Sequence, residues 1–198
     1  MRNFFSILLL SLILAVPPAF GQETAEPPQQ QPAEPENTPA ERLDSLFAEL
    51  KAETQDGKAQ RIARNIWTVW TNSGSATIDL LMEWTATAMS EKNYSMAEDL
   101  LTQITTLRPD YAEGWNRAAT LHFMMSDYGR SLSEIQRTLE LEPRHFGALS
   151  GLAAIMQQTD QDKRALETWY QVLQIYPANE NAQKAVIELE EKLAGEGI

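Results

Sequence analysis

Three short stretches that recur at a fixed interval decide the fold of this chain: LRPDYAEGW (107–115), LEPRHFGAL (141–149) and IYPANENAQ (175–183). Their prolines, Pro109, Pro143 and Pro177, are spaced 34 residues apart. Proline interrupts a helix but suits a helix boundary, so each stretch predicts a junction between two helical units. Working back from the prolines divides the chain into blocks 78–111, 112–145 and 146–179.

Each block has the apolar spacing of two amphipathic helices. Block positions 4, 7, 8 and 11 lie on one face of a first helix, and positions 17, 20, 24 and 27 lie on one face of a second. Positions 8 and 20, where the paired helices approach, hold small or short residues: Thr85, Ala119, Ala153, Ala97, Ser131 and Ala165. Asn93, Asp127 and Asp160 are expected to cap the second helices, and Asp110 with Glu113 is expected to form a capping box.

This period, with small residues at positions 8 and 20 and proline at position 32, resembles the tetratricopeptide repeat (TPR) family. The resemblance implies an all-α, helix-turn-helix solenoid and covers TPR 1 (78–111), TPR 2 (112–145) and TPR 3 (146–179). The chain departs from the family at position 8, where the usual glycine is absent. It also departs at position 17 of the third block, which is Asp162.

The same phase extends to both sides of the three blocks. Residues 41–77 are interpreted as a degenerate N-terminal repeat, with Phe47, Leu50, Ala63 and Trp67 at packing positions and a helix start at Thr38-Pro39. Residues 180–198 are predicted to form a C-terminal capping helix with a polar outer face. The sequence therefore predicts about four helix pairs plus this capping helix.

The N-terminus has the pattern of an export signal. Residues 1–21 combine a positive start, an apolar run and a small-residue cleavage site before Gln22. The apolar run, Phe4 to Val16, is shorter than the roughly 20 residues that a membrane-spanning helix needs. Residues 22–40 are rich in Pro, Gln and Glu and are interpreted as a disordered linker. A cleaved signal peptide predicts a periplasmic protein without a membrane span in its mature form; an uncleaved anchor is the alternative.

Charge and composition exclude several classes of function. The net charge is −12, with 28 acidic and 16 basic residues, which disfavours nucleic-acid binding. The chain has no cysteine, which excludes disulfides and thiol chemistry. No phosphate loop, metal-binding motif or nucleophile motif is present, so we expect no enzyme activity and no cofactor.

Histidines and tryptophans are the remaining candidates for a ligand site. His122 occupies a packing position and is predicted to lie in the core. His145 is expected either to make a simple loop contact or to act as a pH-sensitive cap. The five tryptophans, at 67, 70, 84, 115 and 169, are expected to fill the core rather than to form a ligand cage.

The resemblance also implies where a partner binds. In TPR proteins certain first-helix positions line a concave groove, and here they are Asp79, Met82, Met89, Glu113, Asn116, Thr120, Phe123, Met124 and Gln157. Packing of Met82 and Met89 on a neighbouring block is the alternative. Acidic Asp79 and Glu113 favour a basic or neutral segment. Glu98 and Glu134 are expected on the convex side.

The sequence thus predicts a protein or peptide partner without identifying it. The chain resembles small exported TPR proteins of proteobacteria, which implies a periplasmic adaptor in cell-envelope assembly or integrity. The alternative is an accessory TPR subunit of a larger envelope machine, such as the cytochrome c maturation or cell-division apparatus.

Overall fold

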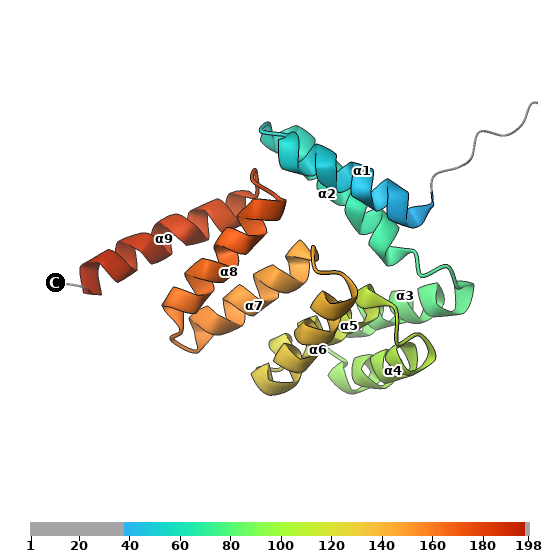
Figure 1. Cartoon of the computed structure of the whole chain (residues 1–198). Helices are drawn as coiled ribbons and strands as arrows, with labels where there is room; N and C mark the ends of the chain where they lie inside the picture. Colours follow the sequence, from blue (N-terminus) through green and yellow to red (C-terminus); the bar gives the residue numbers. More distant parts are fainter. Residues whose placement is uncertain (1–37, 197–198) are drawn as a thin grey trace, which may run out of the picture. The chain divides into compact units, whose positions relative to one another are not determined.

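The helices begin and end close to the boundaries that the repeat predicts. A computed structural model describes residues 38–196, and all of its regular elements over that range are α-helices (Figure 1). They are α1 (Pro39–Ala52), α2 (Asp56–Thr71), α3 (Ala76–Ser90), α4 (Tyr94–Leu107), α5 (Ala112–Met124), α6 (Tyr128–Leu141), α7 (Phe146–Gln158), α8 (Asp162–Ile175) and α9 (Glu180–Glu196). The predicted signal peptide and most of the predicted linker lie outside the described residues. Within 38–196, no helix is long and apolar enough to cross a membrane.

Several helix starts follow the predicted capping chemistry. At α1, the Thr38 hydroxyl accepts the Glu41 N–H at 3.3 Å, and the Glu41 carboxylate accepts the Thr38 N–H at 2.8 Å. Asn93 and Asp127 cap α4 and α6 by accepting backbone N–H groups three residues ahead. Each cap satisfies a donor that the first helical turn leaves unpaired.

Two capping predictions are wrong, for identifiable reasons. Asp160 is not a cap, because it occupies the left-handed turn position (φ 57°) and Gln161 precedes α8 instead. The capping box of Asp110 and Glu113 is absent: Asp110 pairs with Arg108 at 3.0 Å, while Glu113 bonds within the protein interior. Sequence spacing alone did not place these carboxylates correctly relative to the turn.

The paired helices approach closely where the small residues stand. Ala97, Ser131 and Ala165 are fully buried, and so are Thr85 and Ala153 on the facing helices. In the second pair, the Ser131 hydroxyl donates to the Ala119 carbonyl across the contact at 2.8 Å. The pairs α3–α4, α5–α6 and α7–α8 are each in extensive contact, and α9 packs on α8 through Ala182, Val186 and Leu189. The predicted all-α solenoid is confirmed.

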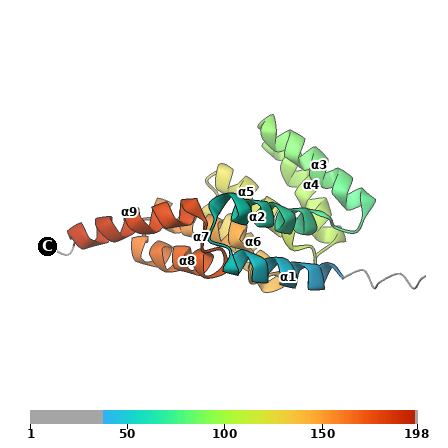
Figure 2. The same cartoon turned by 90° about the horizontal axis from the view of Figure 1, so that it is seen from above.

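The first helix pair does not continue this stacking. α1 and α2 pack on one another, but α2 has few contacts with α3; the pair instead contacts α5 and α8. Figure 2 shows α1 and α2 beside the middle helices, with α3 and α4 to one side. We refer to α1 and α2 together as the N-terminal hairpin.

Polar contacts hold the N-terminal hairpin against the turns between repeats. The Tyr111 hydroxyl donates to the Thr71 carbonyl at 3.1 Å, and Arg108 donates to the Ser73 carbonyl at 2.9 Å. Burial, more than the nearby Glu113 carboxylate, raises the pKa of the Tyr111 hydroxyl well above its usual value. This hydroxyl therefore stays protonated and remains a donor.

A second polar contact joins α1 to the turn before α7. Arg144 pairs with Asp44 at 2.7 Å, and its guanidinium lies 4.3 Å from the centre of the Phe47 ring. Glu142 also binds Arg144, at 2.9 Å, and raises the pKa of that guanidinium. The cation thus joins the hairpin to the turn between the second and third repeats.

Three of the five tryptophans pack in the core as predicted, whereas Trp115 is partly buried and donates its indole N–H to the Pro109 carbonyl at 3.1 Å. Trp70 and Trp169 are buried and Trp67 is partly buried in the same apolar cluster. The prediction of core packing is wrong for Trp84, whose side chain is 47% exposed on α3. It is exposed because the N-terminal hairpin does not lie on that side of α3.

Candidate functional site

A small pocket opens between the first helices of successive repeats. It has a volume of about 140 Å³ and is formed by α5, α6 and α7. The lining residues are Asn116, Ala119, Thr120, Phe123, Ser131, Ile135, Gly147, Ala148, Gly151 and Ala154. We call it the groove pocket. Of the predicted partner-binding residues, it brings together Asn116, Thr120 and Phe123.

The groove pocket exists because two helices present very different side chains. α5 contributes Asn116, Thr120 and Phe123, which share one face at helical spacing. α7 contributes small residues at the same spacing, Gly147, Gly151 and Ala154. The 34-residue period does not point to these small residues, although three of them at successive turns of one apolar helix are a usable signal.

The polar groups of the groove pocket are partly satisfied within the chain. Asn116 donates its side-chain N–H to Glu113 at 2.8 Å, and the Thr120 hydroxyl donates to the Asn116 carbonyl at 3.0 Å. Within residues 38–196, no donor is bonded to the side-chain oxygen of Asn116. The Phe123 ring lies 5.8 Å from that of Tyr128 and is partly buried. The groove pocket thus offers one amide acceptor, one hydroxyl and an apolar ring.

The other predicted partner-binding residues have different surroundings. Met82 and Met89 are 9% and 8% exposed and belong to the core of the first repeat. Asp79 accepts the backbone N–H and hydroxyl of Ser73, at 3.0 and 2.6 Å. Gln157 accepts the indole N–H of Trp169 at 2.9 Å, whereas Met124 is 46% exposed.

Glu113 lies in a buried polar cluster rather than on an open rim. It is 1% exposed, and its carboxylate accepts bonds from Asn116 and from Arg117, at 2.8 and 2.9 Å. His145, also fully buried, caps α7 because its Nδ1 accepts the Ala148 N–H. With Nδ1 accepting, Nε2 is the donor nitrogen of the ring, and it lies 3.3 Å from the Glu113 carboxylate. His145 is thus a helix cap, and the pH sensitivity of this cap stays a prediction.

The N-terminal hairpin packs against the start of α7, next to the groove pocket. Trp70 stacks on the His145 ring with centroids 4.0 Å apart, and Trp67 meets the same ring edge-on at 5.4 Å. A Cβ atom built on Gly147 would lie 2.9 Å from the Trp67 ring, so a glycine is required at that position for α2 to approach α7. Gly147 is shared by the pocket and this contact.

A second polar cluster joins α4, α5 and α6 around the buried side chain of His122. His122 is buried, as predicted, and its Nδ1 lies 2.7 Å from the Glu134 carboxylate, whose pKa burial raises. Arg130 binds both Glu98 and Asp127. Glu98 and Glu134 are therefore both engaged in ion pairs and are unsuitable as inert surface positions.

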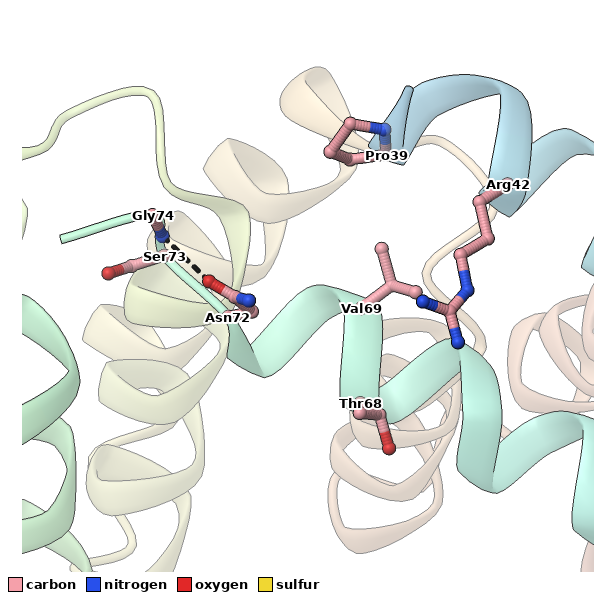
Figure 3. A pocket seen from close by; sticks show the side chains of 7 residues that line it. All are labelled: Pro39, Arg42, Thr68, Val69, Asn72, Ser73 and Gly74. Carbon is pink, nitrogen blue, oxygen red and sulfur yellow. Dashed lines mark hydrogen bonds between the residues drawn. The ribbon is translucent and has the colours of Figure 1, made fainter. Parts of the chain in front are cut away.

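Figure 3 shows a separate hollow beside the hairpin, with a volume of about 550 Å³. Its lining residues come from α1, the end of α2 and the turn that follows: Pro39, Arg42, Thr68, Val69, Asn72, Ser73 and Gly74. The Asn72 side chain accepts the Gly74 N–H at 3.0 Å, and Gly74 has a φ of 72° that glycine adopts readily. Arg42 is the one charged residue among its lining residues.

Stacked antiparallel helix pairs define a helical-repeat protein. No protein-family model matches the sequence. The chain is 50% identical over 159 residues to a TPR repeat-containing protein of Rhizobium etli, covering 80% of this chain and 78% of that protein. This chain therefore belongs to the TPR family.

Solved structures agree on the fold. The first TPR domain of Spaghetti (RPAP3), bound to the HSP90 peptide SRMEEVD, matches with a TM-score of 0.56 at 19% identity, covering 59% of this chain and 93% of that one. The Sgt2 TPR domain of Aspergillus fumigatus gives 0.56 at 18% identity, covering 62% and 83%. MamA gives 0.53 at 16% identity, covering 77% and 81%.

Proposed function

We propose that this protein is a periplasmic adaptor that binds a segment of a partner protein in the groove pocket, in cell-envelope assembly or integrity. The observation that carries the proposal is the meeting of Asn116, Thr120 and Phe123 opposite the small residues of α7. The Spaghetti domain, which shares the fold, is bound to a peptide. The periplasmic location rests on the signal pattern in residues 1–21.

The size of the groove pocket favours a single side chain over a small-molecule ligand. Its volume of about 140 Å³ is below the roughly 300–1,000 Å³ that is typical of small-molecule sites. An apolar side chain of the segment would contact Phe123, while a backbone N–H of the segment would donate to Asn116. We expect an extended segment that buries one such anchor side chain, flanked by weaker contacts.

The uncharged lining of the groove pocket favours a neutral segment of the partner, and the net charge of the chain also allows a basic segment. None of the residues that line it is charged. The preference for a basic segment that rested on Glu113 loses that support, because this carboxylate is buried and paired with Arg117. The remaining attraction for basic residues comes from the net charge of −12 and is screened by salt.

Photocrosslinking in living cells tests the proposal. A photoreactive residue at Thr120, which is exposed beside the groove pocket, should crosslink to the partner, whereas one at exposed Thr102 on α4 should not. Gly151→Leu should reduce crosslinking about tenfold, because the leucine side chain would fill the pocket. The variant should still fold, since a Cβ atom at position 151 would lie 3.6 Å from Ile135, which is an ordinary contact. Gly57→Leu, where a Cβ meets nothing within 4 Å, is the matched control.

Two results would refute the groove as the binding site. One is equal crosslinking from positions 120 and 102. The other is undiminished crosslinking in Gly151→Leu, provided that circular dichroism shows the variant to be folded. Mass spectrometry of the crosslinked band identifies the partner, and cell fractionation tests the periplasmic location separately.

A further inference from the structure

α3 carries two large apolar side chains on its surface. Leu80 and Trp84 are 44% and 47% exposed and stand one helical turn apart, so they are neighbours on one face. Single exposed apolar residues are common on soluble proteins, but an adjacent leucine and tryptophan form a continuous patch. The terminal face of a solenoid is usually polar, which makes this patch informative.

The repeat shows what this face contacts elsewhere in the chain. The equivalent positions are Gly114 and Ala118 in α5, which are both buried, and Ala148 and Leu152 in α7, which are buried and partly buried. A Cβ atom built on Gly114 would lie 2.9 Å from Ile104 of α4. These positions therefore receive the second helix of the preceding pair. On α3 the corresponding surface has the geometry to receive a helix.

The N-terminal hairpin does not occupy this face. The turn between α2 and α3 is held by Ser73, whose carbonyl accepts from Arg108 at 2.9 Å and whose hydroxyl donates to Asp79 at 2.6 Å. α2, which precedes this turn, packs against α5 and has few contacts with α3. Within the described residues, the Leu80–Trp84 face is left open.

Charge distinguishes between the possible occupants. Residues 76–90 contain Asp79 and Glu83 and no basic residue, and Glu83 is exposed next to Trp84. A second copy would bring acidic faces together, which is unfavourable. Residues 22–37 contain four glutamates, no basic residue and no apolar residue larger than alanine or proline, so this segment also fits poorly.

We propose that the Leu80–Trp84 face is a second docking surface, which receives one amphipathic, basic helix of a partner protein. The apolar stripe of the partner helix packs on Leu80 and Trp84, in the way that α4 packs on α5. Lysine or arginine residues beside the stripe lie near Glu83. This surface is independent of the groove pocket, so the failure of either proposal leaves the other standing.

A pair of synthetic peptides tests the proposal. One is a helical peptide of about 18 residues with a leucine-alanine stripe flanked by lysines, and its twin carries glutamate at each lysine position. We expect the lysine peptide to bind the full chain about tenfold more tightly in fluorescence anisotropy, with a difference that shrinks in high salt. Leu80→Ala with Trp84→Ala should weaken its binding about tenfold.

The control variant combines Leu132→Ala and Tyr170→Ala, which are 38% and 41% exposed in the unmodified chain, and it should bind the lysine peptide like that chain. Glu83→Lys should reverse the preference between the two peptides. Equal binding of both peptides by the unmodified chain overturns the proposal without requiring any variant to fold. Undiminished binding by the Leu80/Trp84 variant overturns it as well.

Two further results would assign the face to another occupant and overturn the proposal. One is sedimentation of the full chain as a dimer that Trp84→Ala dissociates. The other is a crosslink from a photoreactive residue at position 84 to residues 1–37 of the same chain.

Discussion

Gly147→Ala tests how closely α2 is fitted against α7. The new methyl group would lie 2.9 Å from two atoms of the Trp67 ring, where ordinary contacts are 3.4–4 Å. The ring has little room to move, because Trp70, His145 and Phe146 surround it at centroid distances of 5.2, 5.4 and 5.7 Å. Overpacking of this kind costs about 1–3 kcal/mol of unfolding free energy.

Gly151→Ala is the matched control in the same helix, one turn further on. Its new methyl group would lie 3.6 Å from Ile135, which is an ordinary contact. Replacing glycine in a helix interior then stabilises the protein by about 0.5–1 kcal/mol. The two variants should therefore differ by about 1.5–4 kcal/mol in urea unfolding. The gap corresponds to at least about 3 °C in melting temperature for a chain of this size.

The same glycine substitution in a Trp67→Leu protein tests whether the Trp67 ring causes the loss of stability. In a Trp67→Leu protein, Gly147→Ala should cost less than about 0.5 kcal/mol, because the ring that it meets is gone. The reasoning fails if Gly147→Ala and Gly151→Ala are equally stable. It also fails if the cost of Gly147→Ala is unchanged by Trp67→Leu.

Three further predictions concern the helix contacts, the turns and the N-terminus. Ala165→Leu should destabilise the protein by about 1–3 kcal/mol, whereas Ala86→Leu on an exposed face should have little effect; equal melting temperatures would contradict the helix pairing. Ser126→Gly should stabilise by up to about 1 kcal/mol, because Ser126 has a φ of 60°, whereas Ser133→Gly within α6 should destabilise by a similar amount in chemical unfolding. N-terminal sequencing of the exported protein should begin at Gln22, and a mature chain that retains Phe4 in the membrane fraction would show an uncleaved anchor.

Local pattern was sufficient to predict the repeats. Each helix pair is specified by residues within its own block: a proline at its end, from the set Pro109, Pro143 and Pro177, and small residues at the helix contact. The structure has those pairs. Asp160 was misplaced by one residue because Asn93 and Asp127 follow the left-handed turn residue, whereas Asp160 is that residue. The residue types at these turns do not show which of them adopts the left-handed conformation, so the one-residue shift could not be predicted.

The candidate site was harder to predict, because burial of its polar residues depends on a distant segment. Asn116, Thr120 and Phe123 line the groove pocket, whereas the role of the predicted residues in binding a partner stays a prediction. Glu113 has the expected helical position, yet His145 and the hairpin cover it. Trp84 matches a packing position and is still exposed, because the N-terminal hairpin, which precedes α3 in the chain, packs on α5 and α8 instead. Neither outcome follows from a 34-residue period, which describes contacts between adjacent repeats only.

The contact between Asp44 and Arg144 changes how this chain is expected to fold and unfold. In a linear solenoid each repeat contacts only its neighbours, so the ends fray separately and folding can begin anywhere. Here the partners are 100 residues apart, and the loop between them must close before the contact forms. That closure raises the contact order and slows folding. It also couples two distant parts of the chain, since the turn that carries Arg144 cannot move away from α1 without breaking the contact with Asp44.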